Sequence, residues 1–280
     1  MVVTVNKIIP FSTVDGPGNR TAIFLQGCNM NCLYCHNPET RSKCVHCGTC
    51  VSSCPTGALS FEGQKVVYNS TKCIHCDRCI NVCPHDSSPK TLDMTPEQVW
   101  QKVENQIPFI RGITVSGGEC TLYPEFLTEL FTLAQAHGLS TLIDSNGTLD
   151  FEQYPDLLAV TDGVMLDIKA GNSEEHKRVT GWDNSLVLKN ARFLASKAKL
   201  YEVRTVVSPD LFDAEQTIIQ TGDMLSGFLS LRPIRYKLIS YRPMGVRQQY
   251  KDTLKIPARE QMEYYARLLA AKGFKDIIII

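Results

Sequence analysis

Cysteine is concentrated in one short stretch of this chain of 280 residues. Eleven of the twelve cysteines lie between residues 28 and 83, and Cys120 stands apart. In a secreted chain this density would predict a disulfide-rich fold, but the N-terminus has neither the hydrophobic stretch nor the cleavage pattern of a secretory signal. The crowding therefore predicts metal centres in a cytoplasmic protein.

The first three cysteines have the spacing Cys28-x3-Cys32-x2-Cys35, on a loop directly after a predicted strand. Thiolates suit zinc or iron–sulfur clusters, and a four-iron cube needs four ligands. Three cysteines leave one iron free to bind a substrate, whereas an electron-transfer cluster is normally closed by four. The alternative, a structural zinc ion with a distant fourth ligand, fits this spacing poorly. We interpret the three residues as catalytic ligands of a [4Fe-4S] cluster.

The other eight cysteines of the stretch form two copies of Cys-x2-Cys-x2-Cys-x3-Cys-Pro. This is the run of two-cluster bacterial ferredoxins, in which the fourth cysteine of each copy serves the other cluster. Two [4Fe-4S] clusters are therefore expected, one on Cys44, Cys47, Cys50 and Cys83 and one on Cys73, Cys76, Cys79 and Cys54. A pair of zinc knuckles is the alternative, although zinc ribbons lack the third Cys-x2 step and the proline.

Short apolar runs alternate with amphipathic stretches in the rest of the chain, which is typical of buried strands separated by helices. We predict strands at 21–26, 112–115, 140–143, 163–168, 202–207 and 235–239, and helices at 124–136, 184–197 and 213–225, with Thr95 capping a further helix. This alternation predicts an α/β fold with a parallel sheet, open or barrel-like. The cysteine repeat interrupts it, so we expect a domain of residues 42–92 inserted into one of residues 1–41 and 93–280.

The charge balance excludes one class of partner. Lysine plus arginine and aspartate plus glutamate both number 29, so the formal net charge is zero. The chain therefore has no overall field to attract nucleic acid or an anionic membrane. The apolar run at 277–280 is also far too short to span a bilayer.

A known family shares these motifs. The segment Gly27-Cys-Asn-Met-Asn-Cys-Leu-Tyr-Cys-His-Asn37 resembles the signature loop of radical S-adenosylmethionine enzymes. With Asp15-Gly-Pro-Gly-Asn-Arg20 upstream, nearly the whole chain is similar to the activating enzymes of glycyl-radical enzymes, which include pyruvate formate-lyase activase. The insert and the opening Ile8-Ile-Pro-Phe-Ser12 most resemble the YjjW-type activases. The resemblance implies a partial (β/α)6 TIM-like barrel carrying a ferredoxin-like insert, in an anaerobic enzyme.

The resemblance also implies roles for residues at the ends of the predicted strands. The cofactor-binding residues would be Tyr34, Gly117, Gly118, Glu119, Asp144, Ser145, Lys169, Arg204 and Arg242. The glycine motif would hold the amino group of S-adenosylmethionine, and Lys169 its carboxylate. Asp144 and Ser145, with Asp167, would line a monovalent-cation site.

Physical reasoning leaves some of these roles open. Two glycines after a strand are more often a plain turn. Arg204 needs an anionic partner or solvent, because it interrupts an apolar strand. Arg242 stands where pyruvate formate-lyase activase has a histidine, and a solvated loop arginine is the alternative. We predict that Cys120 packs as a small buried apolar residue and is not a metal ligand.

The implied reaction is reductive cleavage of S-adenosylmethionine to methionine and a 5′-deoxyadenosyl radical, which removes an α-hydrogen from a glycine of a partner enzyme. Asp15, Gly16 and Gly18 would contact that substrate, and flavodoxin or ferredoxin would donate the electron. Two alternatives remain. A radical enzyme acting on a small molecule would share the cluster and cofactor motifs, whereas a ferredoxin-type electron carrier would leave the first cysteine set unexplained.

Overall fold

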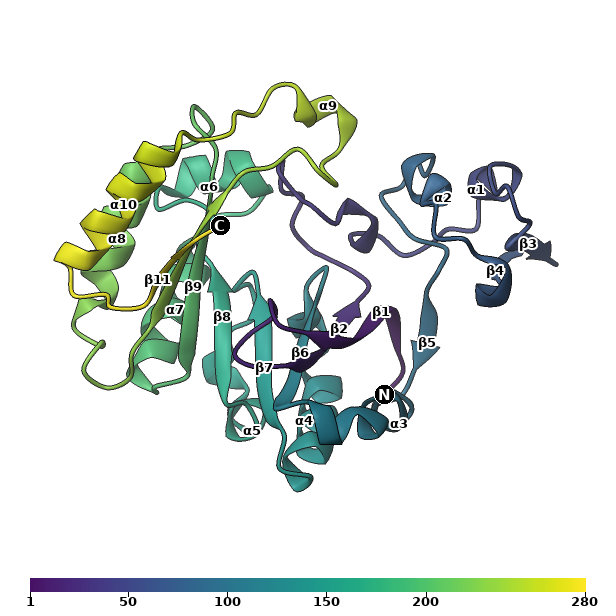
Figure 1. Cartoon of the computed structure of the whole chain (residues 1–280), viewed down its shortest axis with the longest axis horizontal. Helices are drawn as coiled ribbons and strands as arrows, with labels where there is room; N and C mark the ends of the chain where they lie inside the picture. The colour runs from purple at the N-terminus through teal and green to yellow at the C-terminus, as the bar shows by residue number, and fades with distance from the viewer.

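The computed structural model describes residues 1–280. Its framework is one curved sheet of nine strands, in the spatial order β11-β10-β9-β8-β7-β6-β2-β1-β5 (Figure 1). The central strands are β2 (Arg20–Leu25), β6 (Gly112–Gly117), β7 (Ser140–Ser145), β8 (Gly163–Asp167), β9 (Leu200–Val207) and β10 (Arg235–Ser240). They run parallel to one another. The predicted α/β fold with a mostly parallel sheet is therefore confirmed.

Helices pack against the sheet and bury its apolar face in a core cluster of 50 residues. They are α3 (Pro96–Val103), α4 (Pro124–Ala136), α5 (Pro155–Ala159), α7 (Ser185–Ser196), α8 (Ala214–Ser226) and α10 (Arg259–Ala271). The predicted helices correspond to α4, α7 and α8. Two more, α6 (Ser173–Thr180) and α9 (Gln248–Lys251), lie toward the end of the sheet where the parallel strands finish (Figure 1). None of the helices combines the length and the apolar composition that a membrane-spanning helix requires.

The sequence does not predict three strands at the margins of the sheet: β1 (Val3–Ser12), β5 (Leu92–Met94) and β11 (Ile277–Ile279). β1 lies antiparallel between β2 and β5, and β11 pairs in parallel with β10. Register shifts interrupt the pairing of β1, so its side chains do not alternate regularly along the whole strand. The other two strands have three residues each and depend on partners distant in the sequence.

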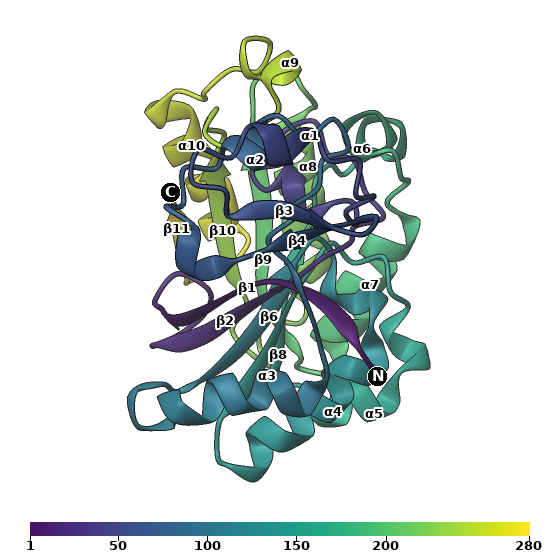
Figure 2. The same cartoon turned by 90° about the vertical axis from the view of Figure 1, so that its right-hand side faces the viewer.

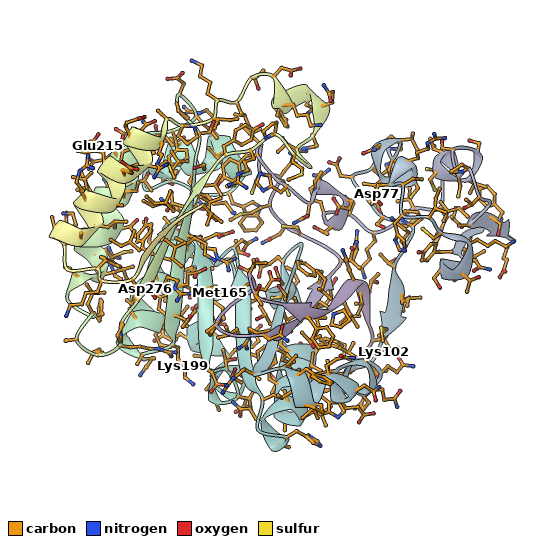
Figure 3. The ribbon with its side chains drawn as sticks, in the orientation of Figure 1. Asp77, Lys102, Met165, Lys199, Glu215 and Asp276 are labelled. Atoms are coloured by element: carbon orange, nitrogen blue, oxygen red, sulfur yellow. The ribbon has the colours of Figure 1, made fainter.

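Residues 43–91 form a lobe that projects beside the sheet (Figures 1 and 2). It contains α1 (Thr49–Ser52), α2 (Arg78–Asn81) and a hairpin of β3 (Leu59–Glu62) and β4 (Lys65–Tyr68). The lobe has its own small apolar cluster of Cys50, Leu59 and Val66. In Figure 3, Asp77 marks the lobe and Met165 the middle of the sheet. The lobe joins the rest of the chain at a bridge between Ser42 and Ser87.

The predicted cap of α3 is present and gives a test of local stability. The Thr95 hydroxyl accepts a hydrogen bond from Gln98 N at 3.3 Å, and the Gln98 side chain accepts one from Thr95 N at 2.9 Å. Thr95→Ala should therefore lower the free energy of unfolding by about 1 kcal/mol. Urea unfolding of the metal-free protein measures this. Thr132→Ala, at an exposed position inside α4, is the matched control and should stay within about 0.5 kcal/mol of the unmodified chain.

Candidate active site

A cavity of about 250 Å³ lies where the parallel strands end. In a parallel sheet the loops after the strands meet at one edge, which is where ligand-binding groups gather. Of the residues predicted to hold the catalytic cluster and the cofactor, all but Arg242 line this cavity: Cys28, Cys32, Tyr34, Cys35, Gly117, Gly118, Glu119, Asp144, Ser145, Lys169 and Arg204. Asp167 also lines it. Four strands, β6, β7, β8 and β9, and the loop after β2 thus contribute these residues to one site.

The loop with the first three cysteines is fastened by backbone hydrogen bonds. Asn31 N and Leu33 N donate to the carbonyls of Thr180 and Val179, at the end of α6, at 2.8 and 3.0 Å. Burial, with a smaller contribution from Glu119, raises the pKa of Cys28 to about 12. Burial likewise raises the pKa of Cys35 to about 11. Metal binding by this loop must therefore displace protons from the thiols.

Three thiols on one cavity wall are a soft donor set, and they fit an iron–sulfur cluster with one open position. No three His, Cys, Asp or Glu side chains of the chain converge as they would around a single metal ion. Tyr34 also lines the cavity, and its hydroxyl is buried without a hydrogen-bond partner.

The glycine motif brings β6 close to the cysteine loop. A Cβ atom at Gly118 would clash with the carbonyl group of Gly27 and lie 2.7 Å from Thr40 O. Gly117 has φ +128°, a conformation that side chains disfavour. These positions therefore need glycine for close packing, and their backbone faces the cavity.

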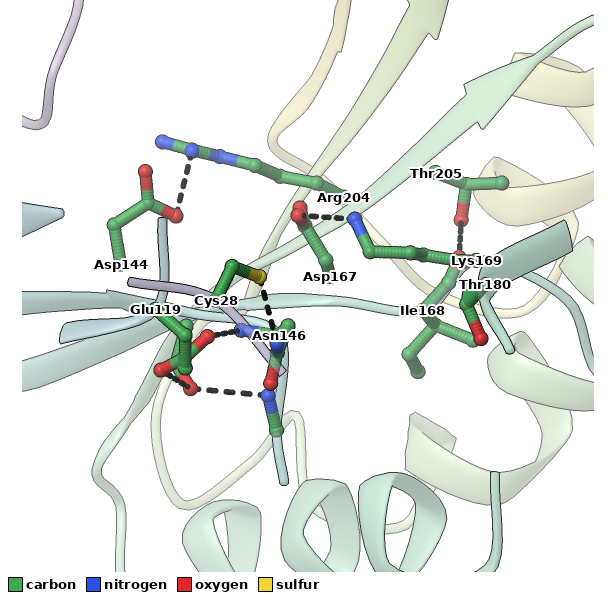
Figure 4. A network of polar contacts seen from close by, with 12 residues as sticks. Cys28, Glu119, Asp144, Asn146, Asp167, Ile168, Lys169, Thr180, Arg204 and Thr205 are labelled. Atoms are coloured by element: carbon green, nitrogen blue, oxygen red, sulfur yellow. Dashed lines mark hydrogen bonds and ion pairs between the residues drawn. The ribbon is translucent and has the colours of Figure 1, made fainter. Parts of the chain in front are cut away.

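Glu119, which also lines the cavity, is held by hydrogen bonds from neighbouring residues. Its carboxylate accepts hydrogen bonds from Asn146 N at 2.6 Å, Ser145 Oγ at 2.9 Å and Thr121 N at 3.1 Å. The residue is 1% exposed. Glu119 thus fastens the loop after β7 to the end of β6 (Figure 4).

Two largely buried ion pairs lie in the lining of the cavity (Figure 4). Arg204 Nη1 lies 2.9 Å from Asp144 Oδ1, and Lys169 Nζ lies 2.8 Å from Asp167 Oδ2. Burial alone would lower the pKa of Arg204, but Asp144 and Glu202 outweigh it and raise that pKa. The anionic partner that a buried Arg204 requires is therefore present.

The structure leaves some predicted residues outside the cavity. Arg242 is exposed, and its carbonyl accepts a hydrogen bond from His36 at 3.0 Å if His36 Nε2 carries the proton. Asp15, Gly16 and Gly18 lie in the turn between β1 and β2, at the start of β2, whereas the cavity follows its end. Cys120 is fully buried, as expected of a small apolar residue, and its thiol donates to Val115 O at 3.3 Å.

Sequence reasoning missed three residues of the site. Arg247 lines the cavity and donates to Cys32 O at 2.8 Å, although it lies in a loop without a recognisable motif. Asn146 lines the cavity near Cys28, and its position after Asp144-Ser145 was the only available signal. Glu202 is fully buried and contacts Arg204 Nε at 2.5 Å. Its place two residues before Arg204 on one strand face could have indicated the pair.

The eight cysteines of the lobe show related geometry. Cys44, Cys47, Cys50 and Cys83 line a common pocket. His46 N donates to Cys44 Sγ and His75 N donates to Cys73 Sγ, both at 3.4 Å. Both histidines have positive φ, 57° and 54°, so the two copies share this turn.

Comparison with known proteins agrees with this site. The Radical SAM superfamily model matches residues 22–220. A "Pyruvate formate-lyase-activating enzyme" of Streptococcus mutans is 33% identical over 86% of this chain and 78% of its own. A "Putative glycyl-radical enzyme activating enzyme" of Haemophilus influenzae is 28% identical over 99% of this chain and 97% of its own.

The fold is also similar to that of QueE from Escherichia coli, with a TM-score of 0.56 and 15% identity over 100% of this chain and 94% of the other. The superfamily match covers more than half of the chain, and the cavity gathers the residues that the superfamily loop and glycine motif predict. The chain therefore belongs to the radical S-adenosylmethionine superfamily and, within it, to the activating enzymes of glycyl-radical enzymes.

Proposed function

We propose that this chain activates a glycyl-radical enzyme, with a [4Fe-4S] cluster held by Cys28, Cys32 and Cys35. When bound, the cluster supplies the electron that cleaves S-adenosylmethionine to methionine and a 5′-deoxyadenosyl radical. That radical takes an α-hydrogen atom from a glycine of the partner, leaving 5′-deoxyadenosine and a glycyl radical. The supporting observation is the convergence of three thiols, a double glycine and two largely buried ion pairs on one cavity.

The residues around the thiols fit the polar half of S-adenosylmethionine. The backbone at Gly117 and Gly118 can approach the amino group because no side chain intervenes. Lys169 and Arg204 supply positive charge for the carboxylate. Lys169 Nζ also lies 5.8 Å from the centre of the Tyr34 ring, which brings the charge beside the cysteine loop.

Two carboxylates in the cavity support a monovalent-cation site. Asp144 and Asp167 both line the cavity, with Ser145 beside them. Each carboxylate is paired with a basic side chain that the proposed cofactor would also attract. A cation held between Asp144 and Asp167 would compensate their charge and leave Lys169 and Arg204 available to the carboxylate of the cofactor.

We further propose that residues 42–92 are a ferredoxin-like domain with two [4Fe-4S] clusters, inserted into a partial (β/α)6 barrel of residues 1–41 and 93–280. The common pocket of Cys44, Cys47, Cys50 and Cys83 supports the exchange of the fourth ligand between copies. Hydrogen bonds from backbone N–H groups to cysteine sulfur are typical of cluster loops and tune their potential. These closed clusters would pass electrons from flavodoxin or ferredoxin, in the reducing cytoplasm.

The proposed protein substrate would contact the turn between β1 and β2. The turn of Asp15, Gly16 and Gly18 has positive φ at both glycines, 126° and 72°, and Gly18 is exposed to solvent. β2, which separates this turn from the cysteine loop, has six residues.

The test is anaerobic reconstitution of the full chain with iron and sulfide. We expect about twelve irons per chain, four for each of three cubes. After reduction with dithionite, methionine and 5′-deoxyadenosine should form in equal amounts from S-adenosylmethionine. A chain that binds this iron but never cleaves S-adenosylmethionine would contradict the proposal.

A further inference from the structure

One carboxylate of the lobe lies between two arginines of the rest of the chain. Asp86 Oδ2 is 3.1 Å from Arg41 Nη2 and 3.3 Å from Arg247 Nη1. Asp86 is the only carboxylate within 4 Å of either guanidinium. The side chains of Asp86 and Arg247 are only 23% and 13% exposed, so solvent ions screen this contact less than a surface ion pair.

Both arginines are also attached to the loop of Cys28, Cys32 and Cys35. Arg247 Nη2 donates to Cys32 O at 2.8 Å, and Arg247 Nη1 donates to Asn31 Oδ1 at 2.6 Å. The carbonyl of Arg41 accepts a hydrogen bond from Cys28 N at 2.9 Å. Both arginines line the active-site cavity. A single carboxylate is thus connected to the backbone at two of the three cysteines.

Asp86 has an unusual backbone conformation at the point where the lobe joins the rest of the chain. Its φ is 48°, which is uncommon for a residue other than glycine and persists only where neighbours enforce it. Its carbonyl accepts a hydrogen bond from Ser42 N at 3.1 Å. The next residue, Ser87, lines the pocket of Cys44, Cys47, Cys50 and Cys83. Asp86 and Ser87 therefore connect the pocket of Cys44, Cys47, Cys50 and Cys83 to the cavity of Cys28, Cys32 and Cys35.

We propose that Arg41, Asp86 and Arg247, here called the Asp86 bridge, fix the cysteine loop against the lobe, and that Arg247 is a positioning residue for the active cluster. This inference rests on the proposed function. The Arg247 guanidinium places a permanent positive charge beside Cys32, which favours the reduced state of the cluster. Lysine would keep the charge but could not make the same forked contacts with Cys32 O, Asn31 and Asp86.

The test compares Arg247→Gln, Arg247→Lys and Asp86→Asn in the reconstituted full chain. The fraction of reduced active cluster at a fixed potential is measured by electron paramagnetic resonance, from the signal that changes when S-adenosylmethionine is added. Arg247→Gln should lower the ratio of reduced to oxidised cluster about tenfold, a shift of 59 mV for one electron. Arg247→Lys should lower this ratio less than Arg247→Gln does. Asp86→Asn, which removes a negative charge, should shift the ratio in the opposite direction.

A second measurement tests the mechanical part of the bridge. Trypsin sites at Lys43 and Lys90 flank the lobe. Cleavage there should become several-fold faster in both Arg247→Gln and Asp86→Asn. The double variant should be no faster than the more sensitive single variant, because both changes open the same contact. Arg259→Gln, which breaks an exposed pair with Glu263 on α10, is the matched control and should change neither readout.

Several results would overturn the bridge. One is an unchanged ratio of reduced to oxidised active cluster in Arg247→Gln. Another is an unchanged rate of trypsin cleavage in Asp86→Asn. A shift in the same direction for both variants would indicate general loosening and not a placed charge. If Arg247→Gln does not fold, the same two measurements on Arg247→Lys and Asp86→Asn test the bridge. Failure of the proposed function would appear separately, as an unmodified chain that loads iron but does not cleave S-adenosylmethionine.

Discussion

Replacing Cys32 with alanine should abolish 5′-deoxyadenosine formation and reduce the iron content from about twelve to about eight atoms per chain. The reason is that three thiols are the whole protein ligand set of the proposed active cluster, and two cannot hold a cube with one open iron. Iron analysis and chromatography of the reaction mixture measure both effects. The expected loss of product is at least about a thousandfold, since the cluster carries out the cleavage.

The matched variant is Cys50→Ala, which removes a cysteine of the lobe. It should also lose about four irons. However, it should keep the signal that responds to S-adenosylmethionine, because the cavity of Cys28, Cys32 and Cys35 is untouched. If Cys32→Ala cleaved S-adenosylmethionine at the unmodified rate, the assignment of the active cluster would be wrong.

Changing Gly118 to alanine should weaken binding of S-adenosylmethionine by at least about tenfold and lower the free energy of unfolding by about 1–3 kcal/mol. The new methyl group would meet backbone atoms of Gly27 and Thr40, which cannot rotate away as a side chain could. The glycine motif and the cysteine loop must then separate. Equilibrium binding of S-adenosylmethionine and urea unfolding measure the two effects.

Gly227→Ala is the control for this change. Gly227 ends α8 with φ −65°, and a Cβ there would meet no atom within 4 Å. Alanine should therefore stabilise the chain by about 0.4–1 kcal/mol and leave cofactor binding unchanged. Normal binding of S-adenosylmethionine by the Gly118→Ala protein would show that close approach at Gly118 is not needed.

The sequence predicts the centre of the fold better than its margins. Buried parallel strands appear as continuous apolar runs, and the helices between them show a helical period, so β6 and α4 could be located directly. β1 has an interrupted register, and β5 and β11 have only three residues each. Such strands depend on partners that are distant in the sequence, and no local pattern identifies those partners.

The same distinction applies to the site. Side chains at the ends of buried strands, such as Asp144 and Lys169, could be placed at the cavity because the topology brings strand ends together. Arg247 could not, since its place beside Cys32 depends on the path of a long loop after β10. The hydrogen bonds of Glu119 could not be predicted either. Only the structure reveals that its carboxylate is fully engaged by Thr121, Ser145 and Asn146.

The most direct test of the central proposal is the appearance of a glycyl radical in a second protein. The reduced chain is mixed with S-adenosylmethionine and candidate glycyl-radical enzymes, and the mixtures are examined by electron paramagnetic resonance. We predict a glycyl signal in one partner, formed together with 5′-deoxyadenosine and absent with Cys32→Ala. Cleavage of S-adenosylmethionine without a glycyl signal in any candidate would contradict activation of a protein and favour a small-molecule substrate.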